Sequence, residues 1–419
     1  MRGESGGRRP ATLAVLGALY LSQGIVAGFG GFVLLPTLAA AEVPLHAQTG
    51  LLALASVPWV LKLLWGPVLD RFGARQGGRA RVIVSAAMLG VAATLWWMSR
   101  GLSAGVGPAL DIERVQWLWF LLSVSLSLQD VATDALALDR VAPRDRGLAN
   151  GIMLGGHHVG MEGIGGVVLG ATVVASGIGA ALATMAAVFV VLSLSPALLP
   201  RVDAGSRESS PRLSLSVLGR ALVGTRAARV AAVLAVSMLV CDVATGAISG
   251  QFWVQRLGWS VERVTTELPP LLLGANVVGY LIASVAADRL GHARATGLGA
   301  VALGALFLGF GLLQPWWSDA SFLRGFVVVQ ALATAMMFVG VHALLMGATT
   351  PAVRATHFAV LMALLNAPRV FVPPLAPGLL EALDYAGFFV ACGIVQIGVG
   401  AAAAHFGREV SPRGPAPSA

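Results

Sequence analysis

The chain has 419 residues, of which 57% are hydrophobic and only 11% are charged, and its mean hydropathy is +0.81. Soluble globular proteins carry roughly 25% charged residues, so this composition excludes that class and indicates a polytopic α-helical membrane protein. The net charge of +8 does not indicate nucleic-acid binding, because the basic residues lie in short turns between apolar segments rather than in one patch.

Twelve apolar segments are long enough to cross a membrane as helices, which takes about 20 residues each. In chain order they cover 12–39, 46–69, 82–100, 115–138, 147–174, the stretch from an SGIG break at 176–179 to residue 199, 230–255, 268–287, 295–315, 325–348, 355–380 and 385–406. We therefore predict an all-α fold of two pseudo-symmetric six-helix bundles, formed by residues 1–200 and 230–419 and joined by a polar cytoplasmic linker at 201–229.

The distribution of basic residues predicts the topology. With both termini on one side, 21 arginines lie on that side and five on the other, while Arg369 and the only lysine, Lys62, lie within the membrane. Because cationic loops stay in the cytoplasm, this bias predicts an inner (cytoplasmic) membrane protein with both termini in the cytoplasm. Eight of the ten tryptophans fall at predicted outer ends and form an expected aromatic belt: Trp96, Trp97, Trp117, Trp119, Trp253, Trp259, Trp316 and Trp317.

An internal repeat divides the chain into similar halves. The sequence DRFGAR begins at Asp70, after the second predicted helix, and DRLGHAR begins 218 residues later at Asp288, after the eighth. Parallel six-helix repeats occur in one large class of secondary transporters. The run GPVLDRFGAR (66–75) resembles the loop signature of the major facilitator superfamily. This resemblance implies alternating access and gating roles for Asp70, Arg71, Asp288 and Arg289.

A narrower resemblance rests on four runs: SVPWVLKLLWGPVLDRF, LQDVATDALAL, RGLANGIMLGG and ALLNAPRVFVPPLAPGLLE. They are similar to the AmpG-type permease branch of that superfamily, which includes muropeptide importers, acetyl-CoA transporters and siderophore-uptake permeases. The runs ATDALAL and RGLANG look closest to the siderophore group. In the branch, Tyr-Arg usually follows the Gly-Gly pair of the fifth helix, whereas this chain has His157-His158, so a fixed charge is replaced by one that depends on pH.

The first candidate site consists of Lys62, Asp130 and Asp134. Lys62 lies eight residues before Asp70, which places it about 12 Å inside the membrane at about 1.5 Å per helical residue. Asp134 and Asp130 lie about 9 and 15 Å deep and share a helix face, because they are four residues apart. We therefore expect an interhelical ion pair. It is either a structural bridge or a proton-sensitive switch, because burial and a nearby cation affect a carboxylate in opposite directions.

Arg369 is the second candidate. It lies fifteen residues after Arg354, near the membrane midplane, in a proline-broken run that begins at Asn366. Broken helices at that depth line cavities, and a guanidinium can bind a carboxylate or phosphate through two hydrogen bonds. The alternative is that Arg369 pairs with Asp242, which lies at a similar depth in the seventh predicted helix.

The fifth predicted helix contributes His157, His158 and Glu162. His158 and Glu162 are four residues apart, so we expect them to interact, and Glu162 is a further proton-coupling candidate. Histidine titrates near physiological pH, which suits coupling, although a packing role is the alternative for both histidines and for His342. The other polar candidates for the substrate cavity are Gln23, Gln129, Asn276 and Asn366, and Gly156, Gly160, Gly166 and Gly170 predict close helix packing.

These features predict a secondary active transporter that imports an anionic or zwitterionic small molecule, siderophore-like or muropeptide-like, together with protons. An intramembrane enzyme with Asp130 and Asp134 as an acid–base pair and a non-transporting receptor are the alternatives. The sequence contains no HExxH or Walker A motif, which argues against a zinc-dependent enzyme of that type and against ATP drive. We expect a monomer in the lipid bilayer, with no catalytic residue, metal or cofactor, because Cys241 and Cys392 show no metal-ligand spacing.

Overall fold

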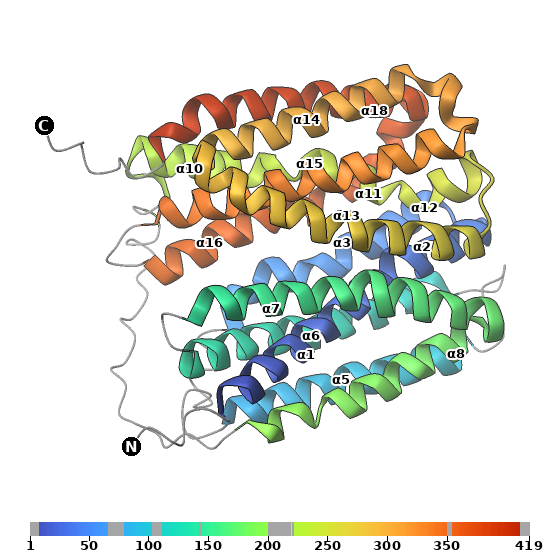
Figure 1. Cartoon of the computed structure of the whole chain (residues 1–419). Coiled ribbons are helices and arrows are strands. Elements are labelled where there is room, and N and C mark those ends of the chain that lie inside the picture. The colour runs from blue at the N-terminus through green and yellow to red at the C-terminus, as the bar shows by residue number, and fades with distance from the viewer. Residues whose placement is uncertain are drawn as a thin grey trace, which may run out of the picture. The chain divides into compact units, whose positions relative to one another are not determined.

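The computed structural model describes residues 8–65, 79–102, 111–141, 145–199, 219, 222–349 and 354–410. Every element in these ranges is helical, which confirms the predicted all-α class (Figure 1). Nine segments of the described chain are long and apolar enough to cross a membrane. The protein is therefore a multi-pass membrane protein.

The described helices form two compact units. The first contains those of Met1–Arg207 and Ser249–Leu273, and the second those of Glu208–Ile248 and Gly274–Ala419. The helices of the first unit are α1 (Arg8–Gly28), η1 (Phe29–Leu34), α2 (Leu35–Ala40), α3 (Leu45–Val60), η2 (Leu61–Leu64), α5 (Arg79–Gly101), α6 (Ile112–Arg140), α7 (Arg146–His158), η4 (Val159–Val168), α8 (Leu169–Leu192), η5 (Ser195–Leu198), α12 (Ser249–Gln251), η6 (Phe252–Arg256) and the first part of α13 (Val261–Leu290). The predicted division at 201–229 stays a prediction.

The second unit begins with α10 (Arg226–Met238) and α11 (Val240–Ala247). It continues with the rest of α13, α14 (His292–Leu312), η7 (Gln314–Ser318), α15 (Ala320–Gly347), α16 (Arg354–Asn366), α17 (Pro368–Phe371), η9 (Pro373–Leu375), α18 (Ala376–Phe406) and η10 (Gly407–Glu409). Short π- or 3-10 segments interrupt several long helices, as proline and glycine in membrane helices permit.

Two backbone breaks divide the longest apolar segments, Leu148–Leu198 and His357–Glu409, into two predicted helices each. Gly177 has φ +84° inside the predicted SGIG break, a conformation that glycine adopts without a Cβ clash. Asp384 has φ +54° directly before the predicted helix at 385–406. The arrangement agrees with twelve predicted spans, of which the second continues beyond η2 into residues outside the described chain.

The predicted start of the eighth helix was wrong. The eighth helix was expected to begin at Leu268, but α13 begins at Val261. The polar residues that suggested a loop are satisfied locally. Arg263 Nε donates to Glu267 Oε1 at 2.8 Å, and its guanidinium lies 3.9 Å from the centre of the Trp259 ring. These contacts let the helix extend by two turns before its apolar part.

Glycines allow close packing between helices of the first unit. The expected close packing of Gly156 and Gly160 is confirmed, since a Cβ at either would collide with the α1 backbone, at Gly17 O and Leu21 O. Gly166 and Gly170 face Pro269 and Thr265 of α13, where an added Cβ would lie 2.5 Å from each side chain. Small residues let helix backbones approach each other, and in lipid this packing takes the place of a hydrophobic driving force.

The second unit shows the same principle between α14 and α18. Gly304 lies so close to α18 that a Cβ there would be 2.6 Å from Ile397 N, and a Cβ on Gly297 would be 2.5 Å from the Ala404 Cβ. At the far end of α14, Phe310 stacks on Phe326 with ring centres 3.8 Å apart. Backbone contact and aromatic packing together fix α14 in this unit.

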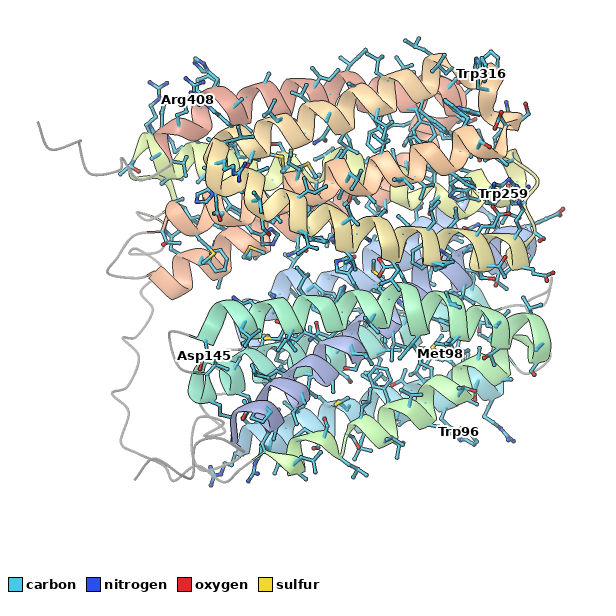
Figure 2. All side chains as sticks on the ribbon, viewed as in Figure 1. Trp96, Met98, Asp145, Trp259, Trp316 and Arg408 are labelled. Carbon is cyan, nitrogen blue, oxygen red and sulfur yellow. The ribbon has the colours of Figure 1, made fainter. Side chains whose placement is uncertain are left out.

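The predicted aromatic belt is only partly correct. Trp96, Trp97, Trp117 and Trp316 are exposed, as interfacial tryptophans should be, whereas Trp119, Trp253, Trp259 and Trp317 are buried and pack within the protein. In the first unit Trp96 lies at the end away from Asp145, and in the second Trp316 lies at the end away from Arg408 (Figure 2). Position along a helix was read correctly from the sequence, but orientation around its axis was not available from it.

Candidate functional site

A buried polar network joins α1, η2 and α6 in the first unit. Lys62 Nζ lies 3.2 Å from Asp130 Oδ2, and Gln23 Nε2 donates to Asp130 Oδ1 at 3.0 Å. The expected interhelical ion pair is therefore present. Asp130 is almost fully buried, while the Lys62 side chain is 25% exposed, so the pair has one side open. Its part in transport is a proposal.

Asp134 lies one helical turn further along α6 and has a different partner. The Tyr20 hydroxyl donates to Asp134 Oδ1 at 2.8 Å. Sequence reasoning missed Tyr20, although the chain has only three tyrosines and this one lies in an apolar helix. A buried phenol usually finds a hydrogen-bond partner, which is the signal that could have singled it out.

Gln129 extends this network through hydrogen bonds to Gln23 and Thr133. It is fully buried, its Oε1 accepts from Gln23 Nε2 at 3.0 Å, and its Nε2 donates to Thr133 Oγ1 at 3.1 Å. Gln23, expected at the cavity, is buried as well and connects Gln129 with Asp130. Both amides are therefore engaged within the protein. A direct substrate contact by Gln129 remains only a prediction.

A second hydrogen bond fixes the chain next to Lys62. Trp65 Nε1 donates to Ser127 Oγ at 2.9 Å, so the chain three residues after Lys62 is also tied to α6. The segment that carries Lys62, η2, is a 3-10 helix that follows Pro58 in α3. Proline removes a backbone donor inside α3, and the tighter turn that follows turns the lysine toward α6.

The histidine pair lies where α7 changes into the π-helical η4. His158 Nδ1 is 3.2 Å from Glu162 Oε1, as the four-residue spacing predicts, and Glu162 is fully buried. The His157 and His158 rings meet edge to face with centres 5.9 Å apart, and both residues are half-buried. π-Helical segments are rare and occur often at functional sites.

The polar residues of the second unit are held differently. Arg369, in α17, and Asp242, in α11, are both half-buried and interact electrostatically. Asn366 Nδ2 donates to Met362 O at 2.8 Å, and His342 Nδ1 lies 2.8 Å from Phe338 O on the same helix. The polar side chains thus contact the backbone of their own helices, and Asn276 is half-buried on α13.

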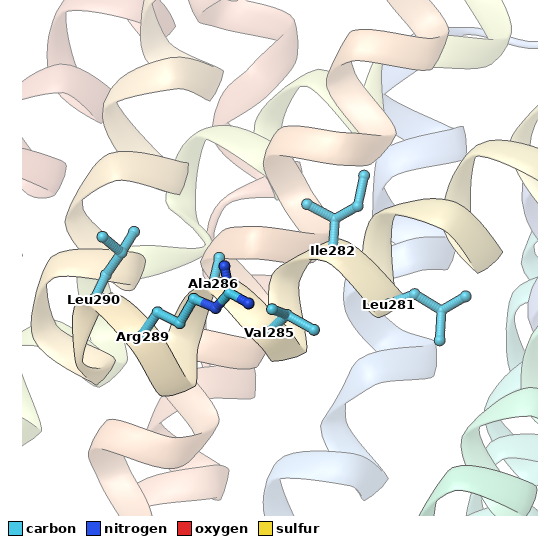
Figure 3. A pocket seen from close by; sticks show the side chains of 6 residues that line it. All are labelled: Leu281, Ile282, Val285, Ala286, Arg289 and Leu290. Carbon is cyan, nitrogen blue, oxygen red and sulfur yellow. The ribbon is translucent and has the colours of Figure 1, made fainter.

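Two of the four proposed gating residues lie in the described chain. Asp70 and Arg71 are outside the described residues, while Asp288 and Arg289 are exposed in the last turn of α13. Arg289 also lines a pocket with Leu281, Ile282, Val285, Ala286 and Leu290 of the same helix (Figure 3). Five of the six lining residues are apolar, so this pocket does not fit a polar substrate, and the gating roles remain predictions.

Comparison with known proteins agrees with this geometry. The family model described as "Major Facilitator Superfamily" matches residues 20–327. Over 342 residues the chain is 24% identical to the anhydromuropeptide permease of Escherichia coli (strain K12), a match that covers 81% of this chain and 69% of the permease. That similarity supports the AmpG-type branch.

Solved transporters share the fold. A mutant of the nucleoside transporter NupG has a TM-score of 0.72 at 14% identity, with 95% of this chain and 99% of that chain covered. A D-xylose-proton symporter has a TM-score of 0.71 at 15% identity, with 95% and 97% covered. At these identities the structural likeness shows the fold alone. Because the family model extends over most of the sequence, this chain belongs to the Major Facilitator Superfamily.

Proposed function

We propose that this protein is a secondary transporter that couples the import of an anionic or zwitterionic small molecule to protons. The observation that carries the proposal is the buried network of Lys62, Asp130 and Asp134 inside an apolar six-helix region. Ionisable groups at membrane depth are costly, and they usually mark an ion or substrate path. Secondary transport is also the activity that the superfamily membership supports.

Proton coupling is supported by the composition of this network. Two carboxylates face one lysine, so the group has a charge that changes with a single proton. The exposed side of Lys62 offers water or substrate access to the ion pair. His158 with Glu162 is a second titratable pair in the same unit, and it stands where the branch pattern has a fixed positive charge.

The charge of the substrate follows from Arg369, Lys62 and the histidines, which supply positive character at membrane depth. Arg369 presents a planar guanidinium that interacts electrostatically with Asp242, and such a group can bind a carboxylate or phosphate through two parallel hydrogen bonds. The similar permease is named for anhydromuropeptides, which makes a muropeptide-like solute the first candidate and a siderophore-like solute the second.

The proposal also includes the topology of the chain and the residues of its cytoplasmic gate. The arginine bias supports cytoplasmic termini in the inner membrane, and we expect a monomer without enzymatic activity. The pairs Asp70–Arg71 and Asp288–Arg289 are proposed to act at the cytoplasmic gate, because the two sequences repeat at the ends of corresponding helices.

The test is an assay in proteoliposomes with a pH-sensitive dye in the lumen. The vesicles are challenged in turn with an anhydromuropeptide, a ferric siderophore and acetyl-CoA. Acidification of the lumen with one of these solutes would identify both the coupling ion and the substrate class. Radiolabelled uptake of a solute without acidification would refute proton coupling, and no uptake by folded protein would refute this group of substrates.

A further inference from the structure

The two carboxylates of α6 have unequal partners. Asp130 accepts one hydrogen bond from the Lys62 ammonium at 3.2 Å and another from the Gln23 amide at 3.0 Å. Within the described part of the chain, the hydrogen bond that Asp134 accepts comes from the neutral Tyr20 hydroxyl, at 2.8 Å. A cation and an amide donor hold Asp130 in its ionised form, whereas a phenol can donate to either form of a carboxyl group.

The charges around Asp134 do not balance, and one added proton would make the buried group neutral. The groups that act on it electrostatically are Asp130 of the same helix, Lys62 of η2 and Tyr20 of α1. Elements α3 and α5 also pack on α6, but their ionisable residues lie near their ends: His46 in α3, and Arg79, Arg81 and Arg100 in α5. With both carboxylates ionised and Lys62 protonated, the buried group has a net charge of minus one.

A net charge in an apolar environment is unfavourable, and uptake of a proton by one carboxylate removes it. Protonation of Asp130 would leave the Lys62 ammonium without its hydrogen-bonded counter-ion. Protonation of Asp134 keeps every contact of the network, because the Tyr20 hydroxyl can still donate to the carbonyl oxygen of the acid.

We infer that Asp134 is the proton-binding carboxylate of this transporter and that Asp130 stays ionised as the partner of Lys62. This inference rests on the proposed proton coupling and assigns its site. The proton is taken up on Asp134 Oδ2, because Oδ1 accepts from Tyr20, and it comes from and returns to water. Tyr20 is a positioning residue: it fixes the orientation of the carboxyl group on α6 and ties the protonation site to α1.

The experiment is an infrared titration of the full-length protein in lipid nanodiscs, which needs no substrate. Acidification of the wild type should produce a carboxylic acid C=O band. Asp134→Asn should lose one component of that band. Tyr20→Phe should keep the component but move it to higher frequency, because a lost hydrogen bond strengthens the C=O bond. Asp242→Asn, which removes a carboxylate from the second unit, is the matched control and should keep the component unchanged.

Each outcome decides the assignment. A band unchanged in Asp134→Asn would overturn it, and so would a band whose frequency does not respond to Tyr20→Phe, a conservative change that keeps the helix packing. The result is separate from the proposed function. Solute uptake without proton movement would refute coupling even if Asp134 titrates, whereas coupled uptake with an unchanged Asp134→Asn spectrum would refute only this assignment.

Discussion

The two units pack their helices in the same way but differ in how they hold the ionisable candidates Lys62, Asp130 and Asp134 on the one hand and Asp242 and Arg369 on the other. In the first, Lys62, Asp130 and Asp134 make direct side-chain hydrogen bonds to other helices at 2.8–3.2 Å. In the second, Asp242 and Arg369 interact through space, and Asn366 bonds the backbone of its own helix. We propose that the arrangement in the first unit serves as an ion switch, and that the arrangement in the second makes a guanidinium available for a ligand.

This difference suggests a division of labour within one chain. A charge that is already paired costs less to keep in a membrane, and it can respond to a proton by changing partners. A charge without a contact partner costs more, but it keeps its hydrogen-bond donors for substrate. The predictions below test whether packing is common to both units and whether the charge arrangement is what distinguishes them.

The largest effect is expected from replacing glycines at close helix contacts, which occur in both units. Gly160→Leu and Gly304→Leu should each cost about 3 kcal/mol or prevent folding, because the new side chain meets backbone atoms of α1 or α18. Thermal unfolding in detergent measures the loss. The matched controls are Gly155→Leu and Gly309→Leu, at positions where nothing lies within 4 Å of the added Cβ. Equal losses for the paired and control sites would contradict the packing model.

The next largest effect is expected in double-mutant cycles, which measure the coupling energy between two charged residues in each unit. Lys62→Met or Asp130→Asn alone should cost about 2 kcal/mol, less than a fully buried pair because Lys62 is partly exposed, and the double variant should recover much of the loss. The same cycle with Arg369→Met and Asp242→Asn should give a smaller coupling, because no contact pair is broken. Equal coupling energies in the two cycles would show that the two units do not differ in how they hold these charges.

Arg369 should matter for binding and little for stability. Arg369→Ala should weaken binding of the transported solute by at least about tenfold, which corresponds to about 1.4 kcal/mol, while the unfolding temperature changes little. Arg369→Lys, which keeps the charge but not the planar pair of donors, should recover only part of the affinity. Isothermal titration with the solute found in the proteoliposome assay measures both. Unchanged affinity in Arg369→Ala would rule out the proposed substrate contact.

Tyr20→Phe should give the smallest of these free-energy changes. It removes one hydrogen bond of 2.8 Å without changing the shape of α1, at a cost of about 1 kcal/mol. In the Asp134→Asn background the same change should cost less, because the charged acceptor is replaced by a neutral amide oxygen. A cost that is independent of residue 134 would show that the phenol acts through another contact.

Part of the site could be predicted from the sequence. Depth counting placed Lys62 between Asp130 and Asp134, and an ion pair with Asp130 was found. Counting could not choose between the two carboxylates, because both lie about 3 Å from the depth of the lysine. The choice depends on the rotation of α6 and on the 3-10 turn of η2, which tertiary contacts such as Trp65 with Ser127 determine.

Other features were beyond local sequence patterns. The glycines of α7 and η4 predicted close packing, but their partner α1 became evident only in the fold. Tyr20 and Asp134 are separated by 114 residues, and nothing in either local sequence links them. Half of the tryptophans at predicted outer ends are buried, because burial depends on which face of a helix meets a neighbour.

By itself, the sequence determined the class, the approximate spans and the break at Gly177, and it predicted which ionisable residues lie at membrane depth. These follow from composition and from properties that act over about 20 consecutive residues. The tertiary structure alone decided which charges meet: Asp130 with Lys62, and Asp134 with Tyr20. The reason is geometric, since successive helical residues point about 100° apart, and only packing against other helices fixes which of them face one another.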